Sequence, residues 1–212
     1  NDSPKTRIPL ILSRSEGYDI ILIQENWIFS KRQLESWLPG FDIVTAKRSR
    51  FLPVISDILN PNGSGLAIAV RDGLEVISTG EISFDTCSGW KDQANDCLAS
   101  KGVLHARIDT GKGEIDIYNT HLDAGGSVYD RRARERQASH MSSYMERTSE
   151  GRAIVLGGDL NIEISSDEFS VLSRLTKGLG LSNINWRPRG SDMQYIDYIM
   201  LRGSSGLDID VL

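Results

Sequence analysis

One stretch decides the fold of this chain: residues 152–162, which read RAIVLGGDLNI. Its first five residues are an apolar run of the kind that forms a buried strand. Two glycines follow and permit a tight turn, so we expect Asp159 and Asn161 to lie together where the strand ends. A carboxylate and an amide placed in this way suit a divalent cation or a phosphate. An Asp-x-Asn turn that hydrogen-bonds to its own backbone would give the same pattern.

Length and composition predict one domain with a sizeable core. The chain has 212 residues, of which 39% are hydrophobic, and this is sufficient for a single core. Its net charge of -5 disfavours a large basic surface for nucleic acid, although a local basic groove is compatible with it. Since no apolar run reaches the length of a bilayer, we predict no transmembrane segment.

The sequence has two cysteines, Cys87 and Cys97, separated by a polar stretch. A disulfide between them would close a small loop and would indicate an oxidising compartment. The alternative is two reduced cysteines in a cytosolic loop. Two cysteines are too few for a typical zinc cluster.

Apolar runs and turn residues predict a sheet with several short connections. The turn signal Arg71-Asp72-Gly73 predicts that strands 66–70 and 74–78 form an antiparallel hairpin. A second hairpin is predicted over residues 101–119, and helices are predicted at 31–38, 130–147 and 167–177.

Polar residues recur where predicted strands end. Glu25 follows the apolar strand 18–23, and His121 follows the second hairpin. Asp197 lies in an apolar strand between two aromatic residues, where an unpaired carboxylate is costly, so we expect it to be buried with a partner. Together with Asp159 and Asn161, these residues suggest one site on a common rim of the sheet.

Five pieces of the sequence resemble the endonuclease/exonuclease/phosphatase superfamily, the group with the deoxyribonuclease I fold. In the order of the family, they are Ile23-Gln24-Glu25, Gly63-Ser64-Gly65-Leu66-Ala67-Ile68, Asn119-Thr120-His121-Leu122, Gly158-Asp159-Leu160-Asn161 and Ile196-Asp197-Tyr198-Ile199. Residues 96–103, the run from Asn119 to Ala124, and the downstream Arg134 and Gln137 are similar to the bacterial sphingomyelinase-like branch.

The resemblance implies an α/β (α+β) fold, a four-layer α/β-sandwich in which two packed mixed β-sheets are flanked by helices. It also implies a divalent-metal-dependent phosphodiesterase that hydrolyses a phosphate ester by in-line attack of water. Hydrolysis of a phospholipid headgroup, as in a sphingomyelinase, is favoured. The cation is expected to be Mg²⁺, a hard ion that prefers oxygen ligands.

The roles of single residues follow from their positions in the family motifs. Glu25 would bind the metal, and His121 would hydrogen-bond to or protonate the phosphoryl group. Asp159 and Asn161 would position the attacking water and the phosphate oxygens. Asp197 would orient a histidine. Asn119, with Asn161, would contact the substrate.

The chain also departs from the family pattern, which includes an early strand carrying an asparagine and a C-terminal Ser-Asp-His. Residues 1–212 contain neither, so we expect a single domain that lacks both segments and is weakly active. Two alternatives remain, a non-catalytic binding protein that keeps the fold and a nuclease. The nuclease would use a basic groove built from Lys47, Arg48, Arg50 and the cluster from Arg131 to Arg136.

We further expect a monomer that is secreted or periplasmic, with a cytoplasmic location as the alternative. Its partners would be a phosphate-ester substrate, either a phospholipid headgroup or nucleic acid, and transiently a membrane surface.

Overall fold

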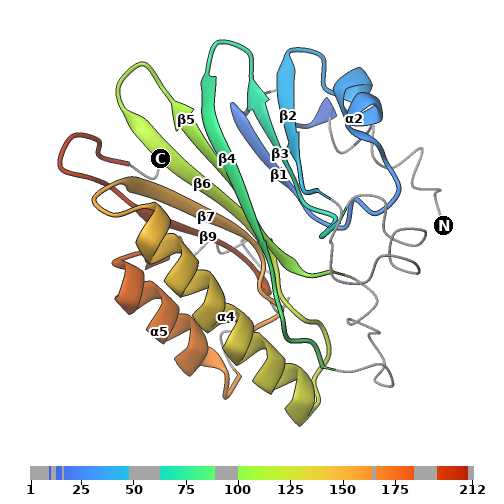
Figure 1. Ribbon diagram of the computed structural model, residues 1–212, viewed down its shortest axis with the longest axis vertical. Helices are drawn as coiled ribbons and strands as arrows, with labels where there is room; N and C mark the ends of the chain where they lie inside the picture. The colour runs from blue at the N-terminus through green and yellow to red at the C-terminus, as the bar shows by residue number, and fades with distance from the viewer. Residues whose placement is uncertain are drawn as a thin grey trace.

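The computed structural model describes residues 10, 13–15, 17–47, 63–88, 100–163, 166–183 and 195–209. Two β-sheets pack face to face, and helices cover both outer faces (Figure 1). The smaller sheet has the strand order β1-β3-β2 and the larger has the order β4-β5-β6-β7-β9-β8. The bounds are β1 Ile20–Ile23, α2 Lys31–Trp37, β2 Phe41–Thr45, β3 Ala67–Arg71, β4 Glu75–Ser83, β5 Gly102–Asp109, β6 Glu114–His121, α4 Val128–Thr148, β7 Ala153–Asp159, α5 Phe169–Leu179, β8 Ser182–Asn183 and β9 Asp197–Arg202.

The layers confirm the expected deoxyribonuclease I-like sandwich. Helix α2 lies outside the smaller sheet, and α4 and α5 lie outside the larger one (Figure 1). The larger sheet is mixed because β6 and β7 run parallel. In the smaller sheet, both described strand pairs are antiparallel. This sheet is therefore not mixed, whereas a mixed sheet was expected. Of the helices in the described ranges, none is long and apolar enough to cross a membrane.

The predicted hairpin between strands β3 and β4 is wrong. Strand β3 is central in the smaller sheet, with β1 on one edge and β2 on the other, and both faces of residues 67–70 are buried. Strand β4 instead pairs with β5 in the larger sheet. The turn at Arg71-Asp72-Gly73 therefore carries the chain from one sheet to the other, because both edges of β3 are already occupied.

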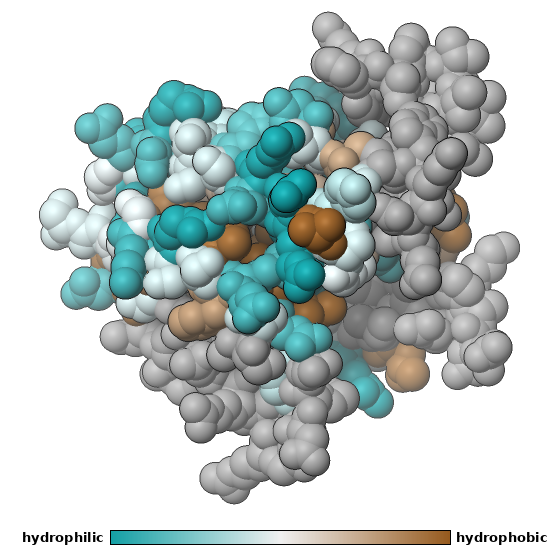
Figure 2. Space-filling model, turned by 90° about the horizontal axis from the view of Figure 1, so that it is seen from below, coloured by the Kyte–Doolittle hydropathy of each residue, from teal (hydrophilic) through white to brown (hydrophobic). Residues whose placement is uncertain are grey.

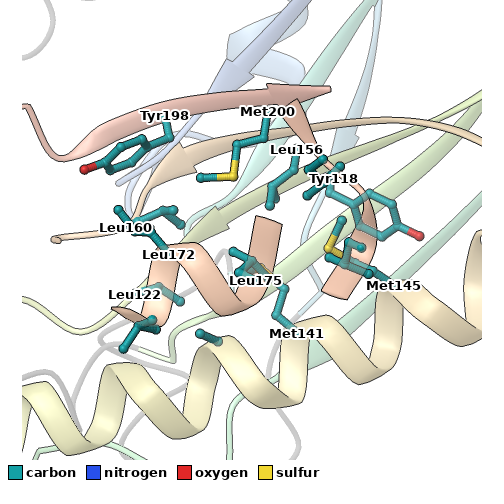
Figure 3. Close-up of a cluster of buried hydrophobic side chains, with 14 of the residues drawn as sticks. Tyr118, Leu122, Met141, Met145, Leu156, Leu160, Leu172, Leu175, Tyr198 and Met200 are labelled. Atoms are coloured by element: carbon teal, nitrogen blue, oxygen red, sulfur yellow. The ribbon is translucent and has the colours of Figure 1, made fainter. Parts of the chain in front are cut away.

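The main core lies between the larger sheet and helices α4 and α5. Figure 3 shows Tyr118, Leu156 and Met200 of the sheet facing Met141 and Leu175 of the two helices. Tight packing of such side chains fixes the helices on the sheet. The larger sheet is thereby held rigid up to the rim at which strands β6 and β7 end.

Gly157 and Gly158 lie inside β7 and do not form the predicted turn. A Cβ atom at Gly157 would lie 2.4 Å from the Leu22 side chain of β1, and one at Gly158 would lie 2.0 Å from the Thr120 carbonyl oxygen of β6. The absent side chains thus permit close approach of the second sheet and of the neighbouring strand. The turn comes later, at Asn161, where φ is 51°.

Candidate active site

The pairing of four strands brings four charged or titratable side chains into one row. His121 at the end of β6 is paired with Asp159 of β7, and Asp159 is paired with Asp197 of β9. On the other side, His121 is paired with Gly102 of β5, which directly follows Lys101. Adjacent strands lie about 5 Å apart, so the row Lys101, His121, Asp159 and Asp197 spans one end of the larger sheet.

Asp159 and Asn161 form a local hydrogen-bonded turn at this rim. The Asn161 backbone N–H donates to Asp159 Oδ1 at 2.8 Å, and Asn161 Nδ2 donates to the Leu122 carbonyl oxygen at 3.0 Å. The Asp-x-Asn turn and the placement of Asp159 in a site are therefore compatible. Asp159 Oδ2 remains on the side of His121, 3.7 Å from its Nε2.

The Asp159 carboxyl is a weaker acid than an ordinary aspartic acid. Burial raises its pKa to about 6, against the hydrogen bond from the Asn161 backbone, which lowers it. The negative charges of Asp197 and Glu25 raise the pKa further, and the positive charge of Lys101 lowers it. Three carboxylates therefore repel one another at the rim, and carboxylates in this arrangement favour a bound cation.

His121 is buried beside a cation rather than a carboxylate. Lys101 Nζ donates to His121 Nε2 at 2.7 Å, and both side chains are buried. Burial and the charge of Lys101 lower the pKa of His121 to about 3, so the imidazole is neutral at pH 7. Because an ammonium can only donate, the ring proton lies on Nδ1. This nitrogen is buried and lacks a hydrogen-bond partner among the residues that the structure describes.

Asn119 joins the two sheets. Its Nδ2 donates to the carbonyl oxygens of Ile23 at 2.8 Å and Ala67 at 2.9 Å, and its Oδ1 accepts from Gln24 Nε2 at 2.6 Å. It is fully buried. This geometry does not fit the expected contact of Asn119 with a substrate. Asn119 instead positions the end of β1, where Glu25 follows.

Glu25 lies on the opposite side of the site from the row on the larger sheet. It is exposed, and its φ of 56° places its backbone in the left-handed region. The next residue, Asn26, donates its backbone N–H to the Gly65 carbonyl oxygen at 2.8 Å. Among the described residues, Glu25 and Asn161 are the non-glycine residues with positive φ. Uncommon backbone conformations of this kind cluster at functional sites.

The expectation that Asp197 is buried is wrong. Asp197 is exposed, as the first residue of β9, and the apolar residues that follow it alternate between the two faces of the sheet. The carboxyl is nevertheless partly shielded from water, and this burial raises its pKa. Its pairing with Asp159 keeps Asp197 at the rim, while a role in orienting a histidine stays a prediction.

Polar residues of α4 hold the loop that follows His121. Arg134 Nη1 donates to the carbonyl oxygens of Asp123 and Gly125, both at 2.8 Å, and Arg134 also forms a bidentate pair with Glu168 at 2.9 and 2.7 Å. Gln137 Nε2 donates to Asp123 Oδ1 at 2.6 Å. Arg134 is buried, so it cannot belong to the basic groove predicted for a nuclease; Arg48 and Arg50 lie outside the described residues.

A second polar cluster lies away from the rim, between the larger sheet and α4. Asp116 Oδ1 is 2.8 Å from His105 Nε2 and accepts from Arg107 Nε at 2.8 Å, and Asp116 Oδ2 accepts from Ser149 Oγ at 2.6 Å. Burial alone would raise the pKa of Asp116, yet the hydrogen bonds from His105, Arg107 and Ser149 lower it to about 2. Every oxygen of this carboxylate is used inside the protein, which indicates a structural role.

A metal at the rim would take oxygen ligands from several strands. In the part of the chain that the structure describes, no three His, Cys, Asp or Glu side chains are grouped closely enough to hold an ion. No described cysteine is free, and Cys97 lies outside the described residues, so its bond to Cys87 stays a prediction.

Comparison with protein families gives a match over nearly the whole chain. The profile described as "Endonuclease/Exonuclease/phosphatase family" matches residues 4–210. Sphingomyelinases of Mycobacterium bovis and Mycobacterium tuberculosis are 25% identical to this chain over 109 residues. That region is 50% of this chain but 21% of each relative, so the match covers a minor part of the relatives' length.

Solved structures share the fold. Sphingomyelinase C from Streptomyces griseocarneus superposes with a TM-score of 0.72 at 15% identity, over 96% of this chain and 77% of that one. A beta toxin variant from Staphylococcus aureus with bound magnesium ions gives a TM-score of 0.71 at 17% identity, over 97% of this chain and 78% of the toxin.

Proposed function

This chain belongs to the endonuclease/exonuclease/phosphatase family, and we propose that it hydrolyses the phosphodiester of a phospholipid headgroup with the help of a divalent cation. The observation that supports this proposal is the row of Lys101, His121, Asp159 and Asp197 on four adjacent strands. Glu25 and Asn161 complete the site from the two flanking loops.

Lys101 and His121 provide the electrophilic side of the site. The Lys101 ammonium contacts His121 Nε2, and an ammonium is a strong ligand for a phosphate oxygen. Neutral His121, whose Nε2 contacts Lys101 and lies 3.7 Å from Asp159 Oδ2, would hold these two groups in place around the phosphate. Because burial and the Lys101 charge lower the pKa of His121 to about 3, we propose this positioning role in place of protonation of the phosphoryl group.

Asp159 provides the basic side of the site. With a pKa of about 6, it is ionised at neutral pH and is still basic enough to accept a proton from an attacking water. The Asn161 backbone N–H holds Asp159 Oδ1 in place, so Oδ2 keeps the direction of the His121 ring. Asn161 and Asp197 flank this carboxylate and would orient the water and the phosphate oxygens.

The carboxylates at the rim are the kind of oxygen donor that a hard divalent cation prefers, although the described side chains are not grouped closely enough to hold one as they stand. Glu25, Asp159 and Asp197 supply oxygen donors, and the mutual repulsion that raises the pKa of Asp159 would be relieved by a positive ion. Glu25 would be its main ligand. When bound, the cation, which we propose to be Mg²⁺, would supply Lewis-acid stabilisation of the leaving oxygen.

A lipid substrate is supported more strongly than nucleic acid. The named relatives are sphingomyelinases, and the buried Arg134 removes one member of the proposed basic groove. We also propose a secreted or periplasmic monomer in which Cys87 and Cys97 are bonded. The whole activity of the longer relatives is not assumed for this chain, so the substrate is a matter for experiment.

The test compares hydrolysis of a short-chain, water-soluble sphingomyelin with nicking of plasmid DNA, each in Mg²⁺ and in EDTA. The variants are Asp159→Asn and Glu25→Gln, and the matched control is Glu35→Gln, which alters an exposed carboxylate on α2. We expect release from the lipid in Mg²⁺ and a loss of about 10³-fold in Asp159→Asn, with the control unchanged.

Nicking of DNA without lipid hydrolysis would replace the proposal with the nuclease. Absence of both activities, with calorimetric Mg²⁺ binding that Glu25→Gln removes, would favour a non-catalytic protein that keeps the site. Equal activities in Asp159→Asn and Glu35→Gln would show that the row is not the active site.

A further inference from the structure

Four large hydrophobic side chains are exposed in segments that follow site residues along the chain. Ile28 is 63% exposed, Val128 is 46%, Tyr129 is 60% and Phe169 is 48% exposed. Each belongs to a segment that leaves the site: Ile28 follows Glu25, Val128 and Tyr129 follow His121, and Phe169 follows Asn161. These four residues, which we call the apolar rim, are half of the eight large hydrophobic residues found exposed among the described residues.

The apolar rim is held firmly by the fold. Ser127 caps α4 just before Val128, with its Oγ accepting the backbone N–H groups of Tyr129 and Asp130 at 3.2 Å. The pair between Arg134 and Glu168 ties the start of α5 to α4, directly before Phe169. A hydrogen bond between the Asn26 side chain and the Phe29 carbonyl oxygen, at 3.0 Å, closes the turn that carries Ile28. Exposure here therefore does not reflect fraying of helix ends.

Basic side chains accompany this rim. Arg131 and Arg132 follow Tyr129 on α4 and are exposed, although the whole chain has a net charge of -5. Figure 2 shows the molecule from the end at which α4 begins, with hydrophobic groups standing among hydrophilic ones. Apolar and aromatic side chains next to arginines match the layered chemistry of a bilayer interface, where apolar groups enter the acyl boundary and cations meet phosphates.

We propose that the apolar rim, with Arg131 and Arg132, binds the surface of a phospholipid bilayer and seats the site over the headgroups. The choice of partner rests on the proposed phospholipid function, while the surface itself is inferred from the exposure of the apolar rim and the charge of Arg131 and Arg132. Nucleic acid fits this surface less well, because Ile28, Val128 and Phe169 offer it no charge and Ile28 and Val128 cannot stack with bases.

The experiment measures partitioning of the protein onto vesicles of phosphatidylcholine, with and without phosphatidylserine, in EDTA so that no lipid is consumed. One variant carries Ile28→Ser, Tyr129→Ser and Phe169→Ser. Its matched control carries Tyr18→Ser, Ile77→Ser and Ile199→Ser, three comparably exposed residues outside the rim. Circular dichroism verifies that both remain folded.

We expect the rim variant to lose at least about tenfold in partition coefficient, the equivalent of about 1.4 kcal/mol, and the control variant to match the natural chain. Arg131→Gln with Arg132→Gln should weaken binding to vesicles that contain phosphatidylserine, and high salt should have the same effect. Equal losses in the two triple variants would overturn the inference, as would binding to duplex DNA and to neither kind of vesicle.

The hydrolysis assay keeps this inference separate from the proposed function. Cleavage of the soluble lipid by a chain that does not partition onto vesicles would overturn the surface and leave the function standing. Partitioning that depends on the rim, in a chain that cleaves neither substrate, would support the surface and contradict the function.

Discussion

Two histidines on adjacent strands of the larger sheet are equally buried, at 3% exposure, and have opposite surroundings. His105 stacks on Tyr118 with ring centres 4.7 Å apart, and its Nε2 contacts a carboxylate that Arg107 and Ser149 also share. His121 faces the Lys101 ammonium, and its Nδ1 has no hydrogen-bond partner within the described part of the chain.

The difference separates a polar cluster that is complete within the protein from one that we propose to be functional. Around Asp116, each buried polar group has a partner inside the protein, so the cluster is complete without a ligand. Around His121, a cation lies beside a neutral base and next to carboxylates that repel one another, an arrangement that a phosphate and a metal would complete. Burial alone does not distinguish the two, whereas hydrogen-bond satisfaction does.

The largest effect is expected from Lys101→Met, which removes the charge and keeps the length of the side chain. Turnover of the lipid substrate should fall by about 10³-fold, because a donor to the phosphate is lost. The pKa of His121, followed by NMR of the ring protons, should rise from its value of about 3, since the Lys101 charge helps to lower it.

Lys112→Met, at an exposed lysine in a turn, is the matched control and should alter neither quantity. A Lys101→Met variant with normal turnover, or with an unchanged His121 pKa, would contradict the assignment of Lys101 to the site.

A smaller effect, on stability, is expected from Asp116→Asn. Removing this buried charge leaves Arg107 without its counter-ion and should lower the free energy of unfolding by about 3 kcal/mol, measured in urea. Turnover per folded molecule should stay the same. Asp72→Asn, at an exposed turn, serves as the control. Loss of turnover without loss of stability would mean that the two clusters are not separate in function.

The smallest effect is the pH dependence of the difference in free energy of unfolding between the natural chain and Asp116→Asn. The pKa of Asp116 is lowered from 3.8 to about 2 in the folded chain, so its contribution is complete above about pH 4 and is lost as the pH falls toward 2. The stability advantage of the natural chain over Asp116→Asn should shrink by about 2 kcal/mol across this window.

His121 provides the internal reference for this measurement. Its pKa is also lowered, so the unfolded chain takes up a proton first and stability falls as the pH drops from about 6.5 to 3. This loss occurs in both proteins and cancels in their difference. A difference that does not change between pH 4 and 2 would show that Asp116 is not held ionised by its partners.

The sequence predicted much of the architecture because its apolar runs are bounded by clear turn residues. Asp159 and His121 stand at strand ends as expected. The partner of strand β4 could not be inferred, because a short turn is compatible with a hairpin or with a crossing between sheets. Only the burial of β3 on both faces decides between them.

Contacts between distant parts of the chain were the least accessible from sequence. Lys101 lies 20 residues before His121, and nothing in their local patterns pairs them before the register of β5 and β6 is known. Arg134 lies 34 residues before Glu168, and its place in an arginine-rich helix suggested a solvent-exposed cation. The helical spacing of Arg134 and Gln137 on one face was the signal that could have identified both as buried.

The hydrogen bonds of Asn119 have a consequence for how the molecule can change. Strands within a sheet have a register because their backbones are paired, whereas apolar packing between two stacked sheets is less directional than hydrogen bonding. Here the Asn119 side chain of β6 donates hydrogen bonds to two backbone carbonyl oxygens of the facing sheet and accepts one from the Gln24 side chain. The stack therefore has a register of its own, and a slip of one residue would separate Glu25 from Asp159 without unfolding either sheet.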